Sequence, residues 1–172
     1  IGGCNGPSGV NRGDVLAYNY GDVFRGEINV DGQDRPWVAS VTGASDFPVV
    51  NAPYPVYGGG STDAVLFRLS SDLSTLEWST FVGGSAADAA YGVQFTPGGE
   101  PVLCGGTTSG NFPTQAGGHD TTFGGLADGF VMRFTPGGGA PTAGTLFGTN
   151  NYDQAYFCLL YTSDAADDKC SV

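Results

Sequence analysis

Positive charge is scarce in this chain of 172 residues. Six Lys and Arg residues stand against 17 Asp and Glu residues, so the formal net charge is -11. A nucleic-acid groove or an anionic membrane surface requires a basic face on the protein, and this composition excludes both as partners. The chain also lacks any apolar run close to the ~20 residues that cross a bilayer as a helix, so we expect no membrane insertion.

Motifs for catalysis, cofactors and metals are missing as well. His119 is the only histidine, Asp120 beside it does not form a Ser-His-Asp triad by adjacency, and the chain has no G-x-S-x-G sequence. The glycine runs 58–60 and 137–139 are not followed by Lys-Ser or Lys-Thr, as a phosphate-binding loop would be. Segment 31–34 lacks the ligand spacing of an EF-hand calcium loop. We therefore predict no catalytic residue, no cofactor and no metal ligand, and leave ligand-binding residues unassigned.

Cysteine is too sparse to form a framework. The four cysteines, at positions 4, 104, 158 and 170, show no C-x-x-C spacing, so neither a zinc site nor a set of disulfides is supported. Cys104 lies in an apolar run, where a free cysteine behaves as a small buried hydrophobic residue.

The last fifteen residues, 158–172, match no other part of the chain. They read Cys-Leu-Leu-Tyr-Thr-Ser-Asp-Ala-Ala-Asp-Asp, followed by Lys-Cys-Ser-Val. This string resembles the translation of the transposase adaptor used in short-read sequencing libraries, with a sample barcode at Lys169 and Cys170. The resemblance implies a tail that is not native, so we leave it out of the fold argument. We also expect the native part to be a gene fragment.

What the chain does contain is one block of about sixty-five residues written twice. The segment 36–42 matches 101–107, the corner Asp-Phe-Pro at 46–48 matches Asn-Phe-Pro at 111–113, and the offset is 65 in both cases. The same offset relates further pairs: Asp63 and Asp128, Arg68 and Arg133, Gly83 and Gly148, Asp88 and Asp153. A constant offset indicates one structural unit per block, which buries its apolar face against its copies.

Apolar residues alternate with period two inside each block, which predicts half-buried strands. Val65, Phe67 and Leu69 would share one face of a strand. The predicted strands are 26–30, 37–42, 64–69 and 76–82 in the first block, and 91–96, 102–107, 129–134 and 142–147 in the second. Four strands per repeat, separated by Gly-rich turns, favour an all-β fold: a β-propeller fragment with two four-stranded antiparallel blades and partial flanking blades. A β-helix is the competing fold, but its coils are shorter.

The predicted organisation follows the repeat. Residues 1–21 end a preceding blade, 22–87 form blade 1, 88–152 form blade 2, 153–157 begin a third blade, and 158–172 are the adaptor-derived tail. Because complete propellers have about four to eight blades, two blades do not close a ring. We expect the isolated pair to expose apolar end faces and to be marginally stable.

Several short motifs occur in the same order in both blocks. Thr42 to Pro48, then Gly59 to Val65, then Trp78 to Gly84 follow the pattern T-x-x-x-DFP, GG-x-x-DAFV, W-S-T-x-x-GG. This pattern resembles the bacterial SBBP β-propeller repeat over residues 22–157, although the second copy lacks the Trp. The resemblance implies a secreted or surface-anchored bacterial protein, often large and modular, whose propeller has no generally established activity.

Long loops join the second and third strands, over 43–62 and 108–127. Their recurring Asp/Asn-Phe-Pro corners favour a structural role, with Asp or Asn capping a turn and Phe in the core. The variable segments 51–55 and 115–120 are better binding candidates. Tyr54 has two interpretations: it stacks on a sugar, or it packs against its own loop. For His119 we expect a solvent-exposed position.

These observations predict an extracellular, non-enzymatic scaffold, adhesion or binding module on a bacterial surface or secreted protein. Its expected partners are an extracellular polysaccharide or a surface protein. One alternative is part of a propeller enzyme acting on polysaccharide, a glycoside hydrolase or lyase, for which Glu27, Glu77 and Glu100 are available acids. Another is a calcium-stabilised spacer using Asp31, Asp34, Asp63 and Asp128.

Overall fold

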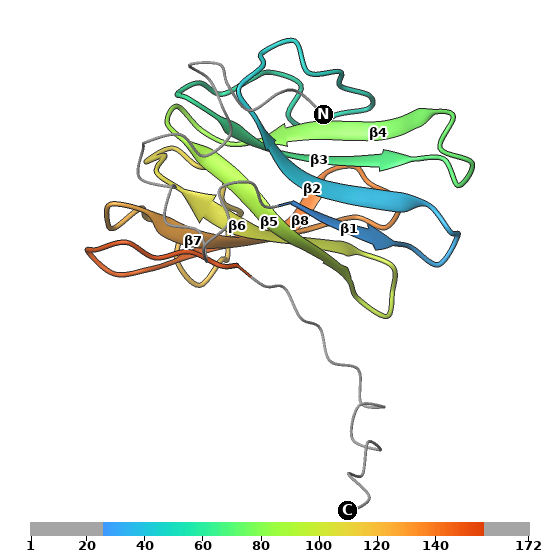
Figure 1. Ribbon diagram of the computed structural model, residues 1–172. Helices are drawn as coiled ribbons and strands as arrows, with labels where there is room; N and C mark the ends of the chain where they lie inside the picture. Colours follow the sequence, from blue (N-terminus) through green and yellow to red (C-terminus); the bar gives the residue numbers. More distant parts are fainter. Residues whose placement is uncertain (1–25, 157–172) are drawn as a thin grey trace, which may run out of the picture.

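A computed structural model describes residues 26–156, which contain eight β-strands and no helix (Figure 1). No helix that could span a membrane occurs among these residues. The predictions for 1–21, 158–172 and Cys4 lie outside the described part. The strands are β1 Glu27–Val30, β2 Pro36–Thr42, β3 Asp63–Leu69, β4 Leu76–Val82, β5 Asp88–Phe95, β6 Pro101–Thr107, β7 Asp128–Phe134 and β8 Pro141–Phe147.

The strands form two antiparallel sheets, each of which follows the chain order. The first sheet has the order β1-β2-β3-β4 and the second β5-β6-β7-β8. The prediction of two four-stranded antiparallel sheets is therefore confirmed, whereas the assignment of these sheets as blades of a propeller stays a prediction.

Pairing registers repeat with the sequence. Trp37 pairs with Arg68 in the first sheet, and Val102 pairs with Arg133, the residues 65 positions later, in the second. The register shift after Arg68 in β3 recurs after Arg133 in β7. The sequence repeat is thus a repeat of individual backbone pairs, because residues at equivalent positions alternate on the same two faces.

The start of β5 differs most from the start that its alternation predicts. We expected β5 to start at Tyr91, but it starts at Asp88. Asp88 to Ala90 pair with Thr107 to Gly105, and a register shift between Ala90 and Gly92 then resets the ladder. Because this irregularity interrupts the two-residue period, the first residues of the strand carry no alternation signal.

The two sheets pack face to face and form the core between them (Figure 1). The first sheet contributes Trp37, Ala39 and Leu66, all with no exposed surface. The second sheet contributes residues such as Phe130 and Met132, which are equivalent to Val65 and Phe67 on the opposite face of the first sheet. The sheets therefore stack front to back, with the same side of each sheet pointing in the same direction along the stack.

Each long loop covers the outer strand of its own sheet. The loop 43–62 pairs with β4 through backbone hydrogen bonds between Val50 and Ser79, and the Phe81 N–H donates to Tyr54 O at 3.2 Å. The loop 108–127 repeats this on β8, where Gln115 N–H donates to Gly144 O and Leu146 N–H to Asp120 O. Pairing of this kind protects an edge strand, which otherwise offers unpaired backbone groups to other chains.

The recurring corners also bind the loops to the sheets. The Phe47 ring lies 5.8 Å from the rings of both Phe67 and Phe81, and the Phe112 ring lies 4.5 Å from Phe130. Phe112 is buried in the core, as expected. Asn111 differs from the expectation of a local turn cap: its Oδ1 accepts a hydrogen bond from the N–H of Ser85, in the segment that joins the two sheets.

Candidate functional site: the contact between the sheets and its open counterpart

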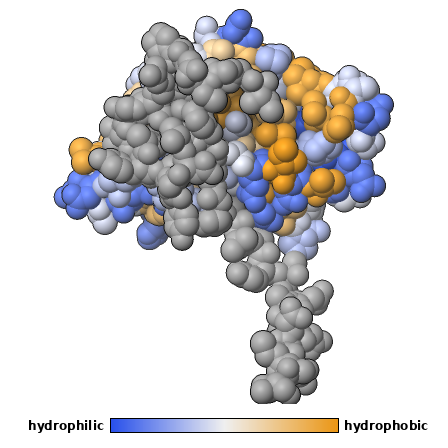
Figure 2. Space-filling model, in the orientation of Figure 1, coloured by the Kyte–Doolittle hydropathy of each residue, from blue (hydrophilic) through white to orange (hydrophobic). Residues whose placement is uncertain are grey.

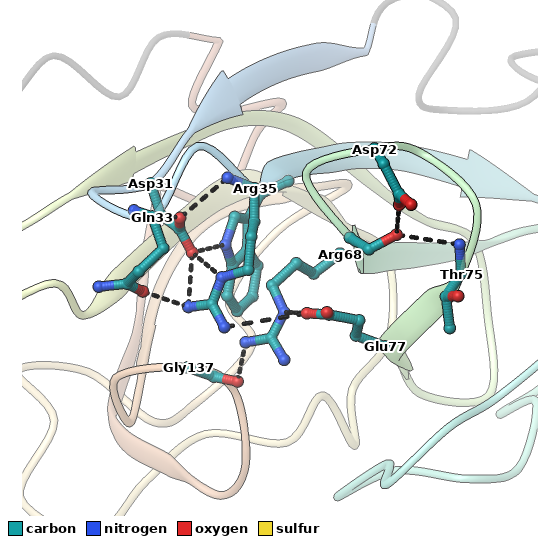
Figure 3. Close-up of polar contacts among 10 residues, drawn as sticks. Asp31, Gln33, Arg35, Arg68, Asp72, Thr75, Glu77 and Gly137 are labelled. Atoms are coloured by element: carbon teal, nitrogen blue, oxygen red, sulfur yellow. Dashed lines mark hydrogen bonds and ion pairs between the residues drawn. The ribbon is translucent and has the colours of Figure 1, made fainter.

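Arg68 of β3 carries the polar part of the contact between the sheets (Figure 3). Its side chain is almost buried, and an Nη1 hydrogen donates to the main-chain oxygen of Gly137 in the β7–β8 turn. Its Nε lies 3.0 Å from a carboxylate oxygen of Glu77, and its guanidinium lies 5.3 Å from the centre of the Trp37 ring. Arg68 thus joins the first sheet to a turn of the second.

Further charges surround this arginine, again as shown in Figure 3. Arg35 forms a 2.8 Å ion pair with Asp31, whose Oδ2 also accepts a hydrogen bond from Trp37 Nε1 at 3.0 Å. Burial acts to raise the pKa of Asp31, but the hydrogen bonds from Arg35 and Trp37 prevail and lower it to about 2. For Arg68, burial and the neighbouring Arg35 lower the pKa, while Glu77 opposes them. Each charge has an opposite charge beside it, which suits a structural contact.

Aromatic side chains form the apolar part of the same contact. The Trp78 ring lies 5.4 Å from Trp37 and 5.8 Å from Phe134 of the second sheet. Gly138 lies directly under the indole: a Cβ at this position would be 2.7 Å from Trp78 Cδ2. Its φ of +91° is also one that favours glycine. A large residue on the first sheet and a glycine on the second therefore fit together.

The glutamates proposed for catalysis each have a separate partner. Glu27 accepts a 2.7 Å hydrogen bond from the N–H of Val93 and so binds β1 to β5. Glu77 pairs with Arg68, and a carboxylate oxygen of Glu100 lies 3.6 Å from Arg133 Nη1. Each of the three acids thus has a protein partner within residues 26–156.

The aspartates suggested for calcium are also engaged separately. Asp63 and Asp128 are buried, and each accepts a hydrogen bond from a glycine N–H at the end of its long loop, Gly58 at 2.7 Å and Gly124 at 2.8 Å. Asp31 pairs with Arg35 as described, and Asp34 is exposed. Within residues 26–156 no three His, Cys, Asp or Glu side chains are grouped as metal ligands.

Sequence reasoning missed one feature of these acids, which is that Asp63 and Asp88 converge. A Cβ on Gly83 would lie 2.9 Å from Asp63 Oδ1 and 2.8 Å from Asp88 Oδ2. Burial raises the pKa of Asp63 to about 6 and that of Asp88 to about 7, and the charge of Asp63 adds to the shift of Asp88. Each acid follows a Gly-Gly pair, 59–60 or 83–84, but no local pattern in the sequence indicates that the two acids meet.

The second sheet lacks the large residue at the position of Trp78. Ala143 and Gly144 stand where the first repeat has Trp78 and Ser79, and beside them lies a hollow of about 350 Å³. Val131, Arg133 and the segment 115–119 are among the residues that line it. Because these strand positions correspond to those of the first sheet that pack on the second, the hollow lies on the outward face of the second sheet.

Arg133 is the counterpart of Arg68 at this hollow. Its Nε donates to Thr142 Oγ1 at 3.2 Å, and its Nη1 faces Glu100. The side chain of Arg133 is 43% exposed, against 10% for Arg68. The arginine at this repeat position is therefore buried in the first sheet, on which the second sheet packs. It is accessible in the second sheet, which is the last of the described sheets.

The two variable loop segments differ in what they offer. Tyr54 packs against the core, and its hydroxyl accepts a hydrogen bond from Gln115 Nε2 at 3.3 Å, so it contacts its own molecule. Burial raises the pKa of Tyr54, and the bond from Gln115 acts against this. His119 is exposed, as expected, and is one of the residues that line the hollow. Segment 115–120 thus has the more open surface of the two.

Comparison of the chain with models of known protein families finds no match, and comparison with curated proteins finds none either.

Proposed function

We propose that the chain is part of an extracellular, non-enzymatic β-propeller in a bacterial surface or secreted protein, where it acts as a scaffold, adhesion or binding module. The observation that carries this proposal is front-to-back stacking. One face of the first sheet packs on the opposite face of the second, and the pairing registers repeat at an offset of 65. A stack with this polarity continues by adding further equivalent sheets, and the SBBP-like motifs supply the same expectation.

The long loops are the surface that we assign to a partner. They lie along the outer strands and expose three large apolar side chains, Val49, Val56 and Leu126, with exposed fractions of 36%, 75% and 63%. The expected partner is an extracellular polysaccharide or a surface protein. Exposed apolar groups suit the apolar faces of sugar rings or a protein surface, and the scarcity of basic residues disfavours an anionic partner.

A binding experiment tests this proposal. The chain would be immobilised and exposed to neutral bacterial polysaccharides and to isolated cell envelopes, with binding followed by interferometry. Val56→Ser and Leu126→Ser should each weaken binding at least about fivefold, because each removes apolar contact. Ile28→Ser is the matched control, since Ile28 is an exposed apolar residue outside the loops.

Two results would contradict the proposal. Absence of binding to every probe argues against a binding module. An equal loss of affinity in the Ile28→Ser control argues against the long loops as the binding surface. Release of reducing sugar from a polysaccharide probe would instead support the enzyme alternative.

A further inference from the structure

Equivalent apolar positions on the two sheets differ sharply in exposure. Ile28 and Val30 of β1 are 68% and 50% exposed. Their counterparts in β5 are Val93, which has no exposed surface, and Phe95, which packs against the core. The counterparts are covered because the first sheet packs on that face of the second. Within residues 26–156 no sheet covers the outward face of the first sheet, which is otherwise the same kind of surface as the covered face of the second. On the side of the molecule drawn in Figure 2, apolar residues of the described part reach the surface beside polar ones.

A second difference is at the β3–β4 turn, where Leu73 is the counterpart of Gly138. The two turns have the same hydrogen bonds: Leu73 N–H donates to Ser70 O, and Gly138 N–H donates to Thr135 O. Both residues have positive φ, +63° for Leu73 and +91° for Gly138. A leucine at such an angle is unusual, and this one is 64% exposed. The position thus holds a strained, exposed leucine where the other repeat has a glycine under Trp78.

The side chains at the two outward faces are complementary in size. Between the sheets, the large Trp78 lies on the small Gly138. At the outward faces the sizes are exchanged: Ala143 replaces Trp78 and leaves the hollow, whereas Leu73 replaces Gly138 and projects from its turn. A leucine side chain has the size and chemistry to enter a hollow that is lined in part by Val131 and Ala143.

We propose that the outward face of the first sheet binds the outward face of the second sheet of another copy of this chain. Leu73 of one copy enters the hollow beside Ala143 of the other. Arg133 there donates to the main-chain oxygen of Asp72, as Arg68 donates to Gly137 within the chain. The contact is head to tail, so it closes into a ring or continues as a filament.

Sedimentation of the complete chain over a range of concentrations tests the proposal. The wild type should associate reversibly as concentration rises. Leu73→Gly removes the projecting side chain and relieves its backbone strain, so folding is retained while association weakens at least about tenfold. Ala143→Trp fills the hollow and should weaken association to a similar extent. The double variant Leu73→Gly/Ala143→Trp should associate again, because it recreates the pair formed by Trp78 and Gly138.

Leu126→Gly is the matched control, since Leu126 is 63% exposed but belongs to the long loop. It should leave association unchanged. A wild type that stays monomeric at all concentrations, single variants that associate normally, or a double variant that stays weak would each overturn the proposal. Polysaccharide binding is measured separately, so loss of either property identifies which proposal has failed.

Discussion

The two repeats have one backbone plan but different surroundings, and the contrast shows which residues serve the strand and which serve the neighbour. Arg68 and Arg133 occupy the same register position. One is buried under a turn of the next sheet, and the other is 43% exposed beside a hollow. Residues at one position in the repeat therefore have different energetic roles, because the role depends on whether another sheet covers them.

The largest effect should come from making the first repeat resemble the second. Trp78→Ala places at β4 the residue that β8 has at position 143. Trp78 is 3% exposed and touches both sheets, so its removal should lower the free energy of unfolding by about 3–5 kcal/mol. Urea denaturation followed by tryptophan fluorescence measures the change. A loss below about 1 kcal/mol would mean that this contact does not hold the sheets together.

The next effect is at Gly138, on the other side of the same contact. Gly138→Ala places a methyl group 2.7 Å from Trp78 and adds backbone strain, which together should cost about 2–4 kcal/mol. Gly99→Ala is the matched control, because Gly99 has a φ of +78° and no atom within 4 Å of a Cβ. Thermal unfolding of both variants separates backbone strain from steric crowding, because only Gly138→Ala combines the two. Equal losses of unfolding free energy would refute the close contact with the indole.

Replacing Arg68 or Arg133 should change stability less than the substitutions at Trp78 and Gly138. Arg68→Met leaves Glu77 and the Gly137 oxygen without their main partner and should cost about 2 kcal/mol. Arg133→Met removes a partly exposed ion pair and should cost no more than about 0.5 kcal/mol. Chemical denaturation of the two variants measures the gap. If the two variants lose the same unfolding free energy, coverage by a neighbouring sheet does not decide how much the arginine at this repeat position contributes to stability.

The smallest effect is the pH dependence from the acids near Gly83. Asp63 and Asp88 have folded pKa values of about 6 and 7, above the usual 3.8. The folded state therefore binds more protons than the unfolded state over this range, so their contribution is most favourable below about pH 4 and is lost as pH rises through 7. Asp88→Asn should reduce the fall in unfolding free energy between pH 5 and 6 by about 1 kcal/mol.

Denaturation at several pH values measures that slope. Asp72→Asn is the control, since Asp72 is exposed and serine hydrogen bonds lower its pKa to about 2, so it does not titrate above pH 5. An unchanged slope in Asp88→Asn would show that this carboxyl does not titrate in the range.

Much of the fold was predictable, because strand alternation and turn residues are local properties. All eight strands were expected close to their observed ranges, and the offset of 65 implied the shared register of Trp37–Arg68 and Val102–Arg133. The early start of β5 was not predicted, since its bulge breaks the period. The blade boundaries, the SBBP resemblance and the extracellular role stay predictions.

The site was less predictable, because it depends on contacts between residues far apart in the chain. The segments 51–55 and 115–120 stay predicted binding candidates, whereas the exposure of His119 was expected and is observed. No local pattern in the sequence indicated that Arg68 would reach Gly137, or that Asp63 and Asp88 would meet beside Gly83. Trp78 and Ala143 were visible as a substitution between repeats, but the hollow that results needs the packed neighbours to define it.

By itself, the sequence determined the strands, their pairing and the equivalence of the two sheets, because alternation and turn chemistry act over a few residues and are copied with the repeat. Tertiary structure alone decided which face of each sheet is covered, and therefore which arginine is buried, which carboxyls hold protons and where a hollow opens. The physical reason is that desolvation and packing depend on what lies across an interface, and identical strands differ in that respect whenever their neighbours differ.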